Sequence, residues 1–214
     1  MSSRRGDPAG LEYVEAARRA HPRDDRWTFH VAAMRMSLGD SSLADSALPR
    51  LVRAGDPEAL LLSGILAAKR DQRERARRLL GRAITAGAYE AEARAVLAAL
   101  AARDRRWGEA GVEVRRSLAA VGSTFRHPYP RDWLGEALTA LSLDGPALRA
   151  DSLLTMALGT RPGWASLYEL EGLVAIRLNH CTDAAERFLT LLDFGMERPD
   201  GPDLVARCRR GLSP

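Results

Sequence analysis

The chain has 214 residues, of which 46% are hydrophobic and 28% are charged, and this balance excludes an intrinsically disordered protein. Its formal net charge is +4, but the arginines are interleaved with Asp and Glu, as on solvated helix surfaces, so charge alone does not favour nucleic-acid binding. The most apolar stretch, residues 60–68, is far too short to cross a bilayer. We expect no signal peptide, because residues 1–7 are polar and no apolar segment follows them, and we expect these residues to be disordered.

The predicted elements are all helices, because Ala and Leu dominate and Val, Ile and Thr form no alternating runs. A first helix is expected over 8–20, and Pro22 shortly after it should prevent the helix from continuing. Helical hairpins follow, and a closing helix is expected over 202–211. The expected hairpins are 25–38 with 42–54, 57–69 with 72–86, 90–102 with 106–120, 131–142 with 146–159, and 164–178 with 182–194.

Prolines and acidic residues mark several of these boundaries. Asp56 before Pro57 predicts a helix start, with an N-cap oxygen followed by proline in the first turn. Asp144 with Pro146 predicts another start of the same kind. Pro49 falls inside the helix expected over 42–54, so it should kink that helix or shift its boundary.

Four alanines recur at a regular interval. Ala76 and Ala110 are 34 residues apart, as are Ala150 and Ala184, and the middle step of 40 contains a six-residue insertion. A period near 34 is typical of stacked helical hairpins, which bury their apolar faces against one another. The period favours a protein that holds another protein over an enzyme.

The pattern resembles the tetratricopeptide repeat (TPR), in degenerate form. In that family a 34-residue hairpin carries a small residue at its eighth position, alanine at its twentieth, a large apolar residue at its twenty-fourth and a small one at its twenty-seventh. The residues here are Ala32, Gly64, Ala98, Leu138 and Gly172 at the eighth, Ala44 and the four alanines above at the twentieth, Leu48, Leu80, Val114, Leu154 and Phe188 at the twenty-fourth, and Leu51, Ala83, Ser117, Ala157 and Leu191 at the twenty-seventh.

The resemblance covers residues 25–195 and implies an all-α fold. It implies a right-handed α-hairpin solenoid of about five TPR-like repeats, with flanking N- and C-terminal helices, as a single domain over 8–212. Another kind of α-hairpin solenoid is the alternative. We also expect Phe188, Leu189, Leu191 and Leu192 to form one inner apolar stripe.

In the TPR family the first helix of each hairpin lines a concave groove that holds a peptide or helix. The expected partner-binding groove here consists of Phe29, Ala33, Met36, Leu61, Ile65, Ala68, Leu173 and Ile176. Such an apolar groove suits an apolar or amphipathic segment of a partner protein. The alternative is that the chain's own helices fill the groove.

The insertion between the third and fourth hairpins is rich in arginine and aromatic residues, which are common in binding hot spots. The expected partner-binding loop consists of Phe125, Arg126, His127, Tyr129, Arg131 and Trp133. The alternative is that its aromatic side chains fill the seam that the insertion creates.

No set of residues predicts catalysis. His180, Cys181 and Asp183 are close in sequence, but they lack the further ligands or base that a metal or nucleophilic site needs. We expect Cys181 and Cys208 to be reduced thiols. We therefore expect no enzyme activity, catalytic residue, metal, cofactor, small-molecule substrate or membrane insertion.

The sequence thus predicts an interaction scaffold, adaptor or chaperone in the cytoplasm, working within a larger bacterial complex. It would bind an apolar or amphipathic segment of another protein. The alternative is an arginine-rich binder of nucleic acid or another anionic partner, whose binding would weaken steeply with added salt.

Overall fold

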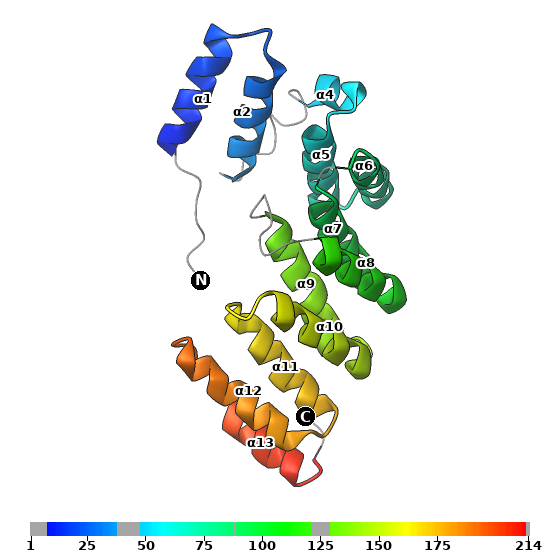
Figure 1. Cartoon of the computed structure of the whole chain (residues 1–214), viewed down its shortest axis with the longest axis vertical. Coiled ribbons are helices and arrows are strands. Elements are labelled where there is room, and N and C mark those ends of the chain that lie inside the picture. Colours follow the sequence, from blue (N-terminus) through cyan, green and yellow to red (C-terminus); the bar gives the residue numbers. More distant parts are fainter. Residues whose placement is uncertain (1–7, 38–47, 88, 121–128, 213–214) are drawn as a thin grey trace. The chain divides into compact units, whose positions relative to one another are not determined.

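The computed structural model describes residues 8–37, 48–87, 89–120 and 129–212, and every regular element in these ranges is a helix (Figure 1). The helices are α1 (Pro8–Ala20), α2 (Asp25–Ser37), α4 (Pro49–Ala54), α5 (Pro57–Lys69), α6 (Arg73–Thr85), α7 (Glu90–Arg103), α8 (Trp107–Ala120), α9 (Tyr129–Leu143), α10 (Ala147–Thr160), α11 (Ala165–Arg177), α12 (Cys181–Asp193) and α13 (Gly201–Arg209).

The expected helices are confirmed to within two residues at each end that the structure describes, with one exception. The exception is the helix expected over 42–54. Its first part lies outside the described residues, and α4 begins at Pro49, which occupies the first turn. Proline suits that position because its missing N–H has no helical partner there. The expected disorder of residues 1–7 also lies outside the described residues.

The chain forms two compact units, Met1–Ala93 and Arg94–Pro214, and the boundary falls within α7. In the first unit α1 packs against α2, and α5 packs against both α4 and α6. In the second unit each helix from α8 to α13 contacts the next helix along the chain. Three pairs there also join a helix to the next but one: α8 with α10, α9 with α11, and α11 with α13.

The turns within three of the hairpins, α5–α6, α7–α8 and α11–α12, share the same backbone geometry. Asp71, Arg105 and Asn179 each have a positive φ, of 56°, 56° and 62°. The N–H of the following residue donates to the carbonyl five residues earlier in each case: Gln72 to Ala67 at 2.8 Å, Arg106 to Ala101 at 2.9 Å, and His180 to Ala175 at 2.8 Å. This bond is a helix C-terminal motif closed by a left-handed residue. The 34-residue spacing in the sequence therefore corresponds to a recurring turn.

The turn between α9 and α10 differs. Pro146 stands there in the place of Gln72, Arg106 and His180, and proline has no N–H to donate. Gly145 instead donates to the carbonyls of Leu141 and Ala140, at 3.1 and 3.3 Å. A Cβ atom on Gly145 would lie 2.8 Å from the carbonyl oxygen of Leu141, so only glycine fits this tighter turn.

Within two hairpins a glycine on the first helix faces a large side chain on the second. A Cβ atom on Gly64 would lie 2.8 Å from Leu80, and one on Gly172 would come closer still to Phe188. Both pairs are sixteen residues apart. The missing side chain lets α5 approach α6, and α11 approach α12, to direct contact.

Cys181 and Cys208 form a disulfide, with their Cα atoms 5.7 Å apart. The prediction of two reduced thiols is therefore wrong for this structure. It rested on the small number of cysteines, their spacing and the expected cytosolic location. The contact arises because α13 folds back along α12 and brings its last turn beside the first residue of α12.

Candidate partner-binding site

Most side chains of the predicted groove are covered by the chain itself. Leu61, Ile65 and Ala68 belong to a run of buried residues, Ala59–Ala68, that covers every side of α5, and each is 1% exposed. Of the others, Phe29, Met36 and Ile176 are buried, and Ala33 and Leu173 are partly exposed. This burial favours the alternative in which the chain's own helices fill the groove.

The predicted partner-binding loop is described only from its second half onward. Phe125, Arg126 and His127 lie outside the described residues, and Tyr129 begins α9.

Two later residues of that loop make cation–π contacts within the chain. The guanidinium carbon of Arg131 lies 4.9 Å from the ring centroid of Trp164. That of Arg103 lies 4.6 Å from the ring of Trp133, which is 6% exposed. Trp133 thus packs inside the second unit, as the seam-filling alternative expects, and contributes to stability.

A cleft of about 370 Å³ lies between α12 and α13, and we call it the α12–α13 cleft. Its lining residues are Ala185, Phe188, Leu189, Leu192, Glu197, Arg198, Gly201, Pro202, Val205, Ala206 and Arg209. Most of these are apolar. Leu189 and Leu192 are 63% and 55% exposed and lie one helical turn apart, so they form an exposed apolar pair beside the cleft.

The floor of the cleft is shaped by Phe188. Its ring packs against Gly172 of α11, and a Cβ atom on Gly201 of α13 would lie 3.3 Å from it. Behind the ring lies a small core that includes Ile176, Leu191 and Val205. Two glycines thus allow two helices to approach one aromatic ring, and the ring has little room to move.

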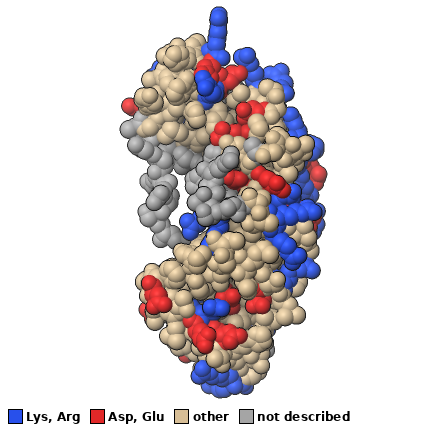
Figure 2. Space-filling view, in the orientation of Figure 1, with Lys and Arg blue, Asp and Glu red and all other residues tan. Residues whose placement is uncertain are grey.

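Charged side chains border the cleft unequally. Arg198 is already engaged, with Nη1 2.5 Å from Glu169 Oε1 and Nε 2.9 Å from Asp200 Oδ1. Arg209 is exposed and makes no ion pair with any residue that the structure describes. Figure 2 shows basic side chains gathered at the end of the second unit where α13 lies. The cleft therefore joins an apolar floor to an exposed arginine, Arg209, and an exposed carboxylate, Glu197.

A buried carboxylate lies on the neighbouring helix α11. Glu171 is 7% exposed, and its Oε2 lies 2.5 Å from Nε of Arg187 on α12. Burial raises the pKa of Glu171 above its ordinary value, and this effect outweighs the opposing effect of Arg187. The pair joins α11 to α12. The charges of Asp151 and Asp183 add to the increase in this pKa, and a side-chain hydrogen bond with Thr155 opposes it.

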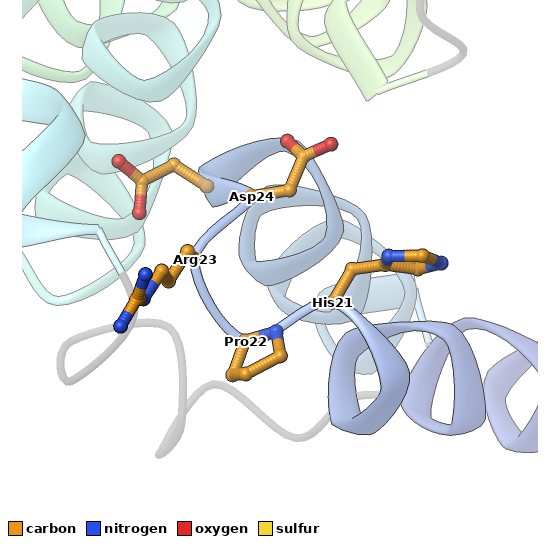
Figure 3. Close-up of a pocket in the computed structure, with 5 residues that line it drawn as sticks. His21, Pro22, Arg23 and Asp24 are labelled. Atoms are coloured by element: carbon orange, nitrogen blue, oxygen red, sulfur yellow. The ribbon is translucent and has the colours of Figure 1, made fainter.

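An open depression of about 630 Å³ lies at the turn between α1 and α2, lined by residues 21–25. Figure 3 shows the side chains of His21, Arg23 and Asp24 pointing away from one another. Arg26 donates hydrogen bonds to Asp24 at 3.0 and 2.6 Å, and this bonding lowers the pKa of Asp24 to about 2. The polar groups do not converge on one point, as a substrate site would require.

Among the described residues, no three His, Cys, Asp or Glu side chains are grouped so that they could hold a metal ion. None of the described helices combines the length and apolar character needed to span a membrane.

Comparisons with known proteins give no match: no family model, no curated protein and no solved structure is significantly similar to the chain.

Sequence reasoning placed Leu189 and Leu192 in an inner stripe, together with Phe188 and Leu191. In the structure only Phe188 and Leu191 face the core, while Leu189 and Leu192 are exposed. The signal was present in the sequence. Phe188 and Leu191 form one pair with i, i+3 spacing, and Leu189 and Leu192 form another. Together the four side chains cover a wider arc of the helix than contact with one neighbouring helix can bury.

Proposed function

We propose that the chain is a protein-interaction module, an adaptor or chaperone, that binds an amphipathic helix of a partner protein in the α12–α13 cleft. The observation that carries the proposal is the pair of exposed leucines, Leu189 and Leu192, beside an apolar cleft of about 370 Å³. Exposed apolar patches bordered by polar residues are typical of protein-binding surfaces.

We further propose that the helices stack as TPR-like repeats. The recurring turns at Asp71, Arg105 and Asn179 support this arrangement. The burial of the recurring alanines supports it too, since Ala76, Ala110, Ala150 and Ala184 are each 0% exposed. In such an array each hairpin buries the apolar face of its neighbour, and the last hairpin depends on a closing helix. The helix α13 is short and leaves part of α12 uncovered.

The chemistry of the cleft indicates the kind of helix that it accepts. Leu189 and Leu192 lie one turn apart, so an apolar ridge with i, i+3, i+4 and i+7 spacing would pack along them. Arg209 at the edge favours an acidic residue beside that ridge, and the exposed Glu197, which also lines the cleft, favours a basic residue elsewhere on the partner. The proposed partner segment is therefore an amphipathic helix with Leu, Ile or Phe on one face and Glu or Asp next to it.

A library of displayed helical peptides tests this proposal. We expect selection on the chain to enrich peptides with that apolar spacing and at least one flanking acid. The synthetic form of an enriched peptide should bind about tenfold or more weakly to the Leu189→Asp/Leu192→Asp variant, by fluorescence anisotropy. The matched control is Leu148→Asp on α10, since Leu148 is 74% exposed and does not line the cleft.

Equal affinity for the parent and the Leu189→Asp/Leu192→Asp variant would contradict the proposal. A second copy of the chain is the other possible occupant. Light scattering would reveal it as a dimer that this variant dissociates, and that result would also contradict binding of a partner helix.

The arginine-rich alternative has one supporting observation, the basic side chains over α6 (Figure 2). Several of these arginines are already engaged. Nε of Arg73 lies 2.7 Å from Asp71, Nη1 of Arg77 lies 2.9 Å from Glu74, and Arg82 donates to the carbonyl of Val52 at 2.9 Å. The two ion pairs offset part of the positive charge, and the bond to Val52 holds the guanidinium of Arg82 against α4, so we favour the partner helix.

A further inference from the structure

The disulfide between Cys181 and Cys208 joins the start of α12 to the last turn of α13. The helix α13 has nine residues, of which only Gly201, Val205 and Cys208 are buried. A helix of this length is not stable alone in water. Its place beside α12 therefore depends on a few apolar contacts and on the disulfide.

The two ends of α13 are held by different means. Before its first residue, Arg198 pairs with Glu169 and Asp200. Near its last residue, the disulfide at Cys208 holds it. Breaking the disulfide would leave the first anchor intact and remove the second. The released half of the helix carries Val205, Ala206 and Arg209, which form one wall of the α12–α13 cleft.

We propose that the Cys181–Cys208 disulfide is a redox switch of the α12–α13 cleft. The oxidised chain holds α13 in place and binds the partner helix, and the reduced chain releases α13 and binds it weakly. This inference rests on the proposed function, because it assigns regulation to the same site.

The reaction is a thiol–disulfide exchange with a dithiol reductant. One thiolate of the reductant attacks Sγ of Cys181, which is half-buried, whereas Cys208 is 4% exposed. The protein's S–S bond breaks, a mixed disulfide forms, and Cys208 leaves as a thiolate that takes up a proton. The second thiolate of the reductant then displaces Cys181 and closes the reductant's own disulfide. The protein gains two electrons and two protons, and the dithiol loses them.

One polar atom lies beside both sulfurs. Oδ1 of Asn179 is 3.8 Å from Sγ of Cys181 and 3.7 Å from Sγ of Cys208. It is an acceptor placed to receive a hydrogen bond from a thiol of the reduced chain. Disulfides in cytosolic proteins are usually transient and redox-sensing, so a switch is compatible with the predicted cytoplasmic location.

Hydrogen exchange measured by mass spectrometry tests the switch without any partner. The chain has 2 cysteines, so any effect of a reductant acts through this pair. We expect the amides of residues 202–209 to exchange about tenfold or more faster after reduction with a phosphine, while those of α11 stay protected. The Cys181→Ser/Cys208→Ser variant should exchange like the reduced parent and should not respond to the phosphine.

Binding of the selected helical peptide supplies the second measurement. We expect its affinity to fall about tenfold or more on reduction of the parent and to be indifferent to reductant in the double serine variant. Unchanged exchange of α13 overturns the switch whatever the peptide does. Faster exchange with unchanged peptide affinity shows that α13 does not control the cleft and overturns it as well. If no peptide binds the oxidised chain in a selection that succeeds with a known binder, the proposed function itself fails, and the exchange data still report separately on α13.

Discussion

At the scale of single residues, the contact between Gly172 and Phe188 gives the sharpest prediction. The ring of Phe188 lies between Gly172 and Gly201, so it cannot retreat from an added methyl group. Gly172→Ala should therefore lower the free energy of unfolding by about 1–3 kcal/mol, measured by chemical denaturation. The control is Gly81→Ala in α6, where a Cβ atom meets nothing within 4 Å. It should stabilise by about 0.5–1 kcal/mol, because alanine is the better helix former. A neutral Gly172→Ala would mean that α11 and α12 are not in contact there.

Glu171 gives a prediction that depends on pH. Its pKa is raised in the folded chain, chiefly by burial, above the ordinary value of 4.5. The folded chain therefore holds this proton more tightly than the unfolded chain. The resulting stabilisation is complete below the unfolded pKa and disappears as the pH rises through the folded pKa. The Glu171→Gln variant cannot ionise, so its stability relative to the parent should increase from about pH 4 to about pH 7. Denaturation midpoints at several pH values check this, with Glu186→Gln, an exposed carboxylate of α12, as control. A difference that does not vary with pH would contradict it.

At the scale of elements, the start of α5 combines two local signals. The N–H of Ala59 donates to Oδ1 of Asp56 at 2.8 Å, and Pro57 occupies the first helical position. Asp56→Ala should remove the capping bond and destabilise the chain by about 1 kcal/mol, whereas Asp56→Asn should retain most of the stability. Thermal unfolding of the two variants tests the cap. Similar losses in both would show that the charge of Asp56, rather than its hydrogen bond, is what matters.

The sequence predicted helices well wherever the signal was local. The start of α5 follows from adjacent residues, Asp56 and Pro57, and it was predicted to the residue. Asp144 was expected to act like Asp56, but Pro146 is the N-cap of α10 and no side chain caps that helix. The difference arises because Pro146 changes the preceding turn. The sequence also gives no local signal that α13 packs back along α12. That arrangement depends on the conformation of residues 194–200, including Gly195 with a φ of 66°. The disulfide and the cleft both depend on that return.

At the scale of the whole molecule, most side chains of the predicted groove are covered for a related reason. The 34-residue spacing indicates which positions of different hairpins would correspond, and Gly64 and Gly172 each face a large side chain. It does not indicate which face stays uncovered. Leu61 and Ile65 were predicted to contact a partner, yet α5 is buried on every side. Leu189 and Leu192 are exposed beside α13, a helix of nine residues, and the 34-residue spacing does not encode the length of that helix.

The division into two compact units gives the last prediction. In a chain whose helices contact mainly their near neighbours, a local defect should weaken its own surroundings more than distant ones. Gly64→Ala and Gly172→Ala introduce the same defect, one in each unit. Native-state hydrogen exchange should show protection falling about tenfold or more around the substituted hairpin, and clearly less in the other unit. If both variants instead lowered protection equally from α1 to α13, the chain would unfold as one cooperative body. The division into two units would then hold for the contacts within the chain but not for its free energy of unfolding.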